Sequence, residues 1–177
     1  MNENVKNFIK IVSTAAVSVT IITQFVLPVN VYGTSMEPGF LHHDYLLVNR
    51  QAYNEYRLPE RGDVIIFSSE SAEKAIQEEI LIKRVIGLPG ETIEISDGEV
   101  YVDGNLIKEN YIKDGYTTGH IEPVKLAEDE YFCMGDNRVR SRDSRSSSIG
   151  PVHFQDIMGR AFLRVYPFNR IKPIKKL

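Results

Sequence analysis

A run of 26 residues without a charged side chain, residues 11–36, limits the folds open to this chain more than any other feature. Its apolar part, with the residues just before it, spans residues 8–27. As a helix rising about 1.5 Å per residue, this segment would be about 30 Å long, enough to span the hydrocarbon core of a bilayer. Lys10 lies near one end, where its stem lets the ammonium reach the headgroups. We therefore predict a membrane anchor over residues 8–27.

Two other interpretations of this segment fit its sequence less well. A cleaved secretory signal carries small residues one and three positions before its cleavage site, whereas Leu-Pro-Val-Asn follows the apolar run here, at residues 27–30. A helix buried in a protein core would carry a polar face and end sooner. We retain the uncleaved anchor.

The charges beside the anchor predict its orientation. Lys6 and Lys10 precede it, while the first basic residue after it is Arg50. By the positive-inside rule, residues 1–7 are cytoplasmic and residues 28–177 form an extracytoplasmic domain at the cell membrane. The single cysteine, Cys133, suits an exported domain without disulfides.

Composition narrows the function classes. The 21 Lys and Arg against 24 Asp and Glu leave none of the basic excess of a nucleic-acid-binding protein. One cysteine and four scattered histidines make a metal centre improbable. We expect any chemistry to run without a metal or cofactor.

The rest of the chain predicts a mostly β fold. Short strand-like runs separated by turn residues occupy residues 44–49, 63–67, 80–86, 91–96, 99–102, 105–107, 131–134 and 158–166. Asp-Gly pairs at residues 97–98 and 103–104 predict hairpin turns. We therefore expect a transmembrane helix followed by an antiparallel β-rich domain, with polar surface insertions at residues 68–79 and 111–130.

No histidine or cysteine stands out as part of a catalytic group. His42, His43, His120 and His153 lack a recognisable signature around them, and each is interpreted as a surface side chain. Cys133 lies in an apolar strand, where a buried structural thiol is expected. A Ser-His-Asp triad is therefore not favoured.

A serine–lysine pair fits better. In a strand over residues 80–86, Leu81, Lys83 and Val85 share one face, and Arg84 lies on the other. Burial between apolar neighbours disfavours the ammonium, and a general base near neutral pH needs a pKa about 3 units below the usual value of about 10.4. Taken alone, a lysine in this pattern is more often an edge residue that reaches solvent.

The serine candidate is Ser35, in the sequence YGTSMEPG at residues 32–39. Gly33 frees the backbone for close approach to a substrate, and the Pro-Gly pair predicts a turn. Ser35 follows the anchor by about eight residues, within reach of the membrane surface.

Five short motifs occur in an order that resembles the prokaryotic type I signal peptidases. They are GTSMEP at residues 33–38, RGDV at 61–64, KRVIGLPG at 83–90, MGDNR at 134–138 and SRDSR at 141–145. The resemblance extends from the anchor to about Pro167. It implies a signal-peptidase-like catalytic domain.

The resemblance also implies roles for individual residues. Ser35 would be the nucleophile and Lys83 the general base in place of histidine. Ser141 would hydrogen-bond the lysine and orient it. Asp143 and Arg145 would support the site through a charge pair.

For the oxyanion hole, the resemblance implies one of the two hydrogen-bond donors and leaves the other open. The Ser35 N–H would form one half of the oxyanion hole. Some family members have a serine two positions before the nucleophile as the second donor. That position is Gly33 here, so the second donor stays open.

The implied substrates are secretory preproteins, cut after small residues at −1 and −3. The expected partners are these signal peptides, membrane lipid and, by proximity, the secretion translocon, with no nucleic acid. Six basic residues after Asp156 could contact anionic headgroups or form a solvated tail.

Three alternatives remain. A self-cleaving Ser-Lys repressor would need a DNA-binding domain where the anchor lies. A processing protease of a conjugation or pilus system would share the chemistry. A non-catalytic membrane-anchored β module would not require Ser35 and Lys83.

Overall fold

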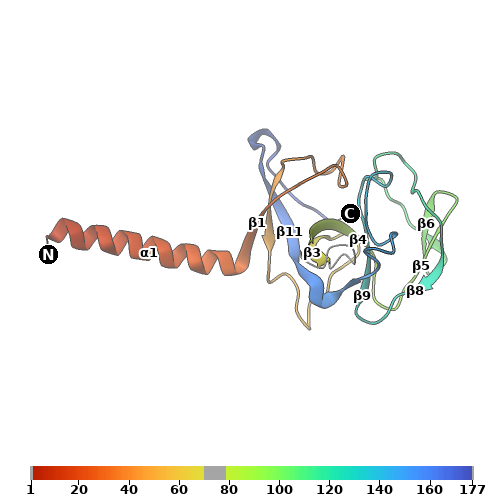
Figure 1. Cartoon of the computed structure of the whole chain (residues 1–177), viewed down its shortest axis with the longest axis horizontal. Helices are drawn as coiled ribbons and strands as arrows, with labels where there is room; N and C mark the ends of the chain where they lie inside the picture. Colours follow the sequence, from red (N-terminus) through yellow and green to blue (C-terminus); the bar gives the residue numbers. More distant parts are fainter. Residues whose placement is uncertain (1, 70–78, 177) are drawn as a thin grey trace.

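The computed structural model describes residues 2–69 and 79–176. Helix α1 (Glu3–Phe25) projects from the β domain (Figure 1) and buries none of its side chains. It is long and apolar enough to cross a membrane. Asn2 caps it by accepting from the Asn4 N–H, so the helix begins before the segment predicted to lie in the membrane. It ends at Phe25 because Val26 and Leu27 are the first residues of a strand.

The larger sheet of the described residues is antiparallel and has eight strands, in the order β1-β2-β11-β3-β4-β9-β10, with β12 paired to β11. Its strands are β1 (Val26–Asn30), β2 (Tyr45–Asn49), β3 (Val64–Ser69), β4 (Glu79–Gly87), β9 (Glu130–Met134), β10 (Val152–His153), β11 (Ile157–Tyr166) and β12 (Lys172–Pro173). Short 3-10 helices, η1 (Phe154–Asp156) and η2 (Phe168–Arg170), flank β11.

A smaller sheet of four strands lies on the side of the domain away from α1 (Figure 1). It contains β5 (Thr92–Ser96), β6 (Glu99–Val102), β7 (Asn105–Leu106) and β8 (Ile121–Lys125). Both predicted Asp-Gly turns have positive φ at both residues, as the tight turns of hairpins require. The predicted class, a mostly antiparallel β domain after an apolar N-terminal helix, is confirmed.

The structure differs from the sequence prediction in several segments. Strand β8 lies within residues 111–130, which were expected as a polar insertion. It is polar because it is an exposed edge strand, whereas Thr117 and Leu126 on either side of it are buried. Ser68 and Ser69 belong to β3, and residues 70–78 of the other predicted insertion lie outside the described residues. Strands β1, β10 and β12 were not predicted.

Two buried ion pairs belong to the region between the sheets. Arg84 donates to both Asp136 oxygens at 2.8 and 2.7 Å, and its guanidinium lies 4.5 Å from the centroid of the Tyr111 ring. Arg138 donates to both Glu109 oxygens at 2.7 and 2.5 Å. Because such charges are costly to bury unless fully hydrogen-bonded, these contacts fix how the connecting loops pack.

The basic residues after Asp156 are largely paired with acids of the domain. Arg164 lies 2.8 Å and Arg170 3.3 Å from Asp44, Arg160 lies 3.4 Å from Asp63, and Lys176 pairs with Glu60. Four of the six basic side chains therefore have acidic partners in the domain, which a solvated basic tail would not have.

We predict that Arg138→Ala lowers the free energy of unfolding by about 3–5 kcal/mol, because it leaves the Glu109 carboxylate buried without its partner. Urea unfolding of the full chain in detergent measures this loss. Arg140→Ala, at an exposed position of the same loop, is the matched control. A loss below about 1 kcal/mol in Arg138→Ala would show that the pair does not hold the loop.

Candidate active site

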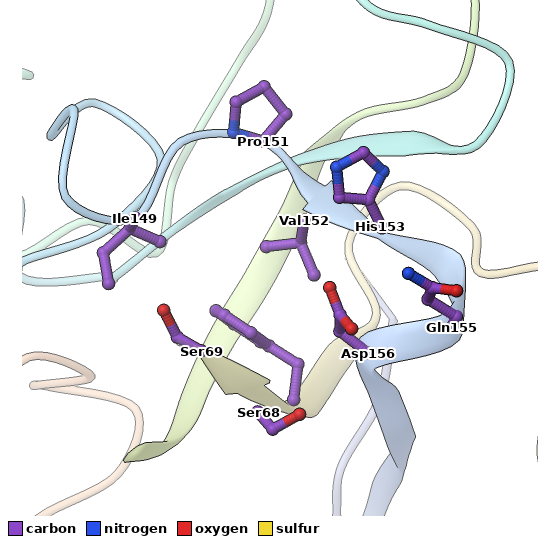
Figure 2. A pocket seen from close by; sticks show the side chains of 9 residues that line it. Ser68, Ser69, Ile149, Pro151, Val152, His153, Gln155 and Asp156 are labelled. Atoms are coloured by element: carbon purple, nitrogen blue, oxygen red, sulfur yellow. The ribbon is translucent and has the colours of Figure 1, made fainter. Parts of the chain in front are cut away.

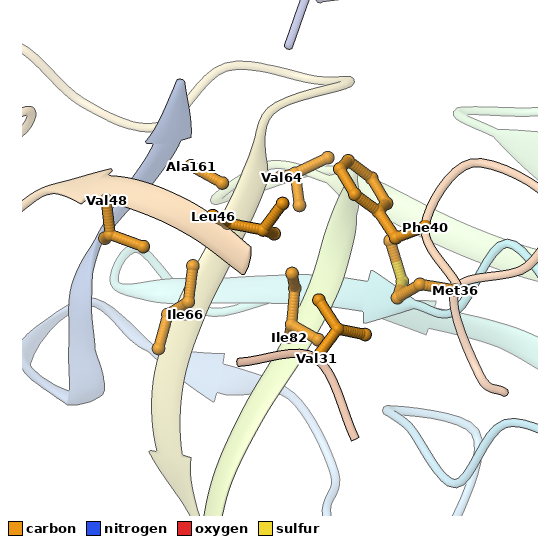
Figure 3. Close-up of a cluster of buried hydrophobic side chains, with 9 residues drawn as sticks. All are labelled: Val31, Met36, Phe40, Leu46, Val48, Val64, Ile66, Ile82 and Ala161. Atoms are coloured by element: carbon orange, nitrogen blue, oxygen red, sulfur yellow. The ribbon is translucent and has the colours of Figure 1, made fainter. Parts of the chain in front are cut away.

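The serine candidate lies on a loop that leaves β1 and returns into β2. Hydrogen bonds close the base of this loop, from the Val31 N–H to the Asp44 carbonyl at 2.9 Å and from the His43 N–H to the Val31 carbonyl at 2.8 Å. Met36 and Phe40 anchor the loop in an apolar cluster with side chains of β2, β3, β4 and β11 (Figure 3). Ser35 is half-buried next to this anchor.

Lys83 comes to the same place from the middle of β4. Only 2% of the residue is exposed, so the alternative of a solvent-reaching edge residue does not hold. Its Nζ lies 3.1 Å from Ser35 Oγ and 3.0 Å from the Ile82 carbonyl oxygen. The structure therefore brings together two side chains that are 48 positions apart in the sequence.

The loop after β9 holds the backbone around Ser35. The Asn137 N–H donates to the Ser35 carbonyl at 2.9 Å, and Asn137 Nδ2 donates to the Thr34 carbonyl at 3.0 Å. Gly135 allows this approach, since a Cβ there would collide with the Ser35 carbonyl and with Ser141 Oγ. Sequence reasoning quoted this motif but assigned no role to Asn137; the Gly-Asp-Asn turn was the available signal.

Asp143 and Arg145 form a bidentate ion pair behind these groups. Arg145 Nε and Nη2 lie 2.8 and 2.9 Å from the Asp143 oxygens, and Asp143 also accepts from the Gly135 N–H at 2.9 Å. Burial by itself raises the pKa of Asp143, but Arg145 and the Gly135 N–H outweigh it and hold that pKa below its usual range. The pair thus supports the Gly135 backbone.

Ser141 is half-buried beside this pair, and its buried Oγ has no hydrogen-bond partner among the residues that the structure describes. It lies close enough to Asp143 to contribute to the low pKa of that carboxyl, but outside hydrogen-bond geometry. The bond to Lys83 that the resemblance implies is not formed in this arrangement.

Gly33 is exposed and has a φ of +81°, a conformation that favours glycine. Its N–H donates to His42 Nδ1 at 3.0 Å. Because this amide is engaged, it is not a free second oxyanion donor.

Among the described residues, no Ser-His-Asp triad lies around the cavity beside the ends of β3 and β10. This cavity, of about 410 Å³, is lined by Ser69, His153 and Asp156 among others (Figure 2). His153 Nδ1 instead pairs with Asp129 at 2.9 Å, which raises the pKa of His153. Burial raises the pKa of the Cys133 thiol, and within residues 2–69 and 79–176 no cluster of three metal-ligating side chains occurs.

The described residues therefore combine a half-buried serine beside a buried lysine with a β domain that carries an apolar N-terminal helix. The family model for signal peptidase, peptidase S26, matches residues 5–166. The chain therefore belongs to the signal peptidase family, peptidase S26, and is a serine peptidase of the signal peptidase I type.

Two of the relatives by sequence support this membership. "Probable signal peptidase I-2" of Synechocystis is 40% identical, over 78% of this chain and 62% of its own length. "Signal peptidase I P" of Bacillus subtilis subsp. natto is 33% identical over 97% of this chain and 95% of its own. A crystal structure of a signal peptidase I from Enterococcus faecalis, 31% identical, covers 59% of this chain and 97% of that one, with a TM-score of 0.45.

We predict that the stabilisation by Asp143 disappears in acid. Because its pKa in the folded protein lies below the unfolded value, its contribution is complete above the unfolded pKa and is lost as the pH falls through the folded one. The difference in unfolding free energy between wild type and Asp143→Asn should therefore shrink from about pH 6 to about pH 3. Urea unfolding at both pH values measures it, with the exposed Asp114→Asn as control. A difference that stays constant with pH would contradict the prediction.

Proposed function

We propose that this protein removes signal peptides from secretory preproteins, with Ser35 as nucleophile and Lys83 as general base. The observation that carries this proposal is the 3.1 Å separation of Lys83 Nζ and Ser35 Oγ, with the amine buried. Burial disfavours the ammonium form and so favours the neutral amine that a base must be. Family membership supports the same reaction.

The proton path follows from the two groups. Neutral Lys83 takes the Ser35 hydroxyl proton while Oγ attacks the scissile carbonyl carbon. The Lys83 ammonium then gives that proton to the leaving amine, and the C–N bond breaks to leave an acyl-enzyme. Lys83 next takes a proton from a water, which attacks the ester carbonyl, and the Lys83 ammonium returns that proton to Ser35 Oγ as the C–O bond breaks.

The surrounding groups have supporting roles in this proposal. The Ser35 N–H is one oxyanion donor. An unpartnered buried hydroxyl is costly, and Ser141 Oγ would gain a partner by bonding Lys83 once the amine is neutral. Asp143 and Arg145 keep the Gly135 backbone, and through it the Ser141 side chain, in place.

The sheet offers an extended substrate a place to bind. Strand β4 pairs with β3 over residues 79–84, but β9 pairs with it only from Arg84 onward. An extended peptide can therefore add along the other edge of residues 80–82, beside Lys83. Val31, Met36 and Ile82 crowd the apolar side of this edge (Figure 3), which favours small side chains at −1 and −3.

The anchor would place this site at the membrane surface, with residues 1–7 cytoplasmic and the β domain outside. Signal peptides emerging from the translocon would then meet the site at a raised effective concentration. Tyr45, Tyr166 and Phe168 form an exposed ladder of edge-to-face rings, with centroids 5.9 and 5.5 Å apart. The loop between β11 and β12 that contains Phe168 lies on the side of the domain nearest α1 (Figure 1), where aromatic side chains suit the lipid interface.

We expect liposome-reconstituted wild type to cut a secretory preprotein once, after a small-x-small sequence, as sequencing of the new N-terminus would show. Ser35→Ala removes the nucleophile and Lys83→Ala the base, so each should lower kcat by at least about 100-fold. Lys83→Arg should be equally inactive, because its guanidinium stays charged. The exposed Lys175→Ala is the control. Unchanged cleavage in Lys83→Ala would overturn the dyad, and an inactive wild type would favour a dedicated substrate or a scaffold.

The chain has no tryptophan, so a single one reports on membrane contact. In liposomes that contain brominated lipid, we expect strong quenching of the fluorescence of Phe168→Trp. Tyr116→Trp, similarly exposed beside the turn between β5 and β6, should be quenched little. Equal quenching of the two variants would contradict the proposed orientation.

A further inference from the structure

The loop that carries Ser35 is held on its upstream side by a side chain of the same loop. His42 Nδ1 accepts the Gly33 N–H at 3.0 Å, a contact between a backbone donor and an imidazole nine positions further along. Gly33 lies two residues before Ser35. A contact that restrains the Gly33 peptide therefore also restrains the backbone that leads into Ser35.

Packing does not restrain Gly33. It has a positive φ, and a Cβ built there would meet no atom within 4 Å. Glycine has the widest choice of backbone conformations, so an open glycine two residues before a nucleophile needs another restraint. The hydrogen bond to His42 is that restraint.

The His42 ring is itself held in place. The His43 ring lies against it, with centroids 3.8 Å apart and a 39° tilt, and Tyr32 meets it edge-on at 5.5 Å. The backbone of His43 is fixed by its bond to the Val31 carbonyl at the base of the loop. The imidazole therefore has a defined orientation although it is exposed.

We propose that His42 is a positioning residue for the reaction at Ser35. This inference rests on the proposed function and adds a residue to it. Asn137 holds the carbonyls of Thr34 and Ser35 on the downstream side, and His42 holds the amide of Gly33 on the upstream side. Together they keep Ser35 Oγ in reach of Lys83, so loss of the His42 acceptor lowers kcat more than it changes KM.

The acceptor exists only while Nδ1 carries no proton, because a protonated imidazole donates from both nitrogens. The titratable side chains facing His42 are His43 and Tyr32 on the same loop. Asp44, two positions further on, is bound by Arg164 and Arg170. A proton on His42 Nδ1 would convert the acceptor into a donor and release the Gly33 N–H.

Two substitutions of His42 distinguish the effect of the hydrogen-bond acceptor from the effect of the aromatic ring. His42→Asn keeps an acceptor at the place of Nδ1 but loses the ring, whereas His42→Phe keeps a ring but loses the acceptor. From the net worth of one hydrogen bond, His42→Phe should lower kcat by about three- to tenfold with little change in KM. His42→Asn should stay within about twofold of wild type.

The control is Leu41→Ala, which shortens an exposed side chain of the same loop. It should leave kcat within about twofold. Wild type should also lose kcat in acid relative to His42→Asn, whose acceptor does not titrate. An equal fall in His42→Phe and His42→Asn, or no fall in either, would overturn the proposal.

A second measurement does not depend on activity. In the full-length Ser35→Ala protein in detergent, the Gly33 amide proton resonance should move with the protonation of His42, and this movement should be absent in Ser35→Ala combined with His42→Phe. If the wild type cleaves nothing but the resonance moves, the proposed function fails while the His42 contact stands. A Gly33 resonance that does not respond would overturn the contact itself.

Discussion

Two consecutive buried cations in β4, Lys83 and Arg84, are the constraint on which the rest of the structure depends. Neighbouring residues of a strand point to opposite faces, so the two charges are buried in different surroundings. Each guanidinium nitrogen of Arg84 donates to Asp136 or to the Gly62 carbonyl, while the Lys83 amine faces Ser35. A register slip of one residue would exchange these surroundings, so the Arg84 pair also fixes which face receives the lysine.

The MGDNR segment at residues 134–138 contacts both Arg84 and the backbone of the Ser35 loop, and so fixes the two relative to each other. Asp136 binds Arg84, Asn137 binds the backbone at Ser35, and Arg138 binds Glu109. Burial raises the pKa of Asp136 while Arg84 opposes that shift, so this carboxylate depends on its partner. Residues 134–138 therefore contact both β4 and Glu109, which precedes the smaller sheet's strand β8. These contacts hold Ser35 and Lys83 in position before any substrate binds.

Local patterns predicted the parts of this structure that depend on neighbours in the sequence. The apolar run predicted α1, and the two Asp-Gly pairs predicted the hairpin turns. The alternation of side chains along a strand placed Lys83 and Arg84 on opposite faces. The contact between Ser35 and Lys83 joins distant positions, so no periodicity could reveal it. The strand position of Lys83 and the resemblance both suggested the pair, but neither predicted its geometry. The His42 contact was missed because a lone exposed histidine has no sequence signature, and β8 because an edge strand can be polar.

The link between the anchor and the sheet determines where the site can act. Helix α1 ends at Phe25 and β1 begins at the next residue, and the Arg50 N–H bonds the Phe25 carbonyl at 2.9 Å. No flexible linker intervenes. Strand β1 runs across the direction of the helix (Figure 1), so the residues directly after Phe25 follow the membrane surface in the proposed orientation. Five strand residues cover only about 17 Å, which keeps the proposed nucleophile near the depth at which a signal peptide leaves the bilayer.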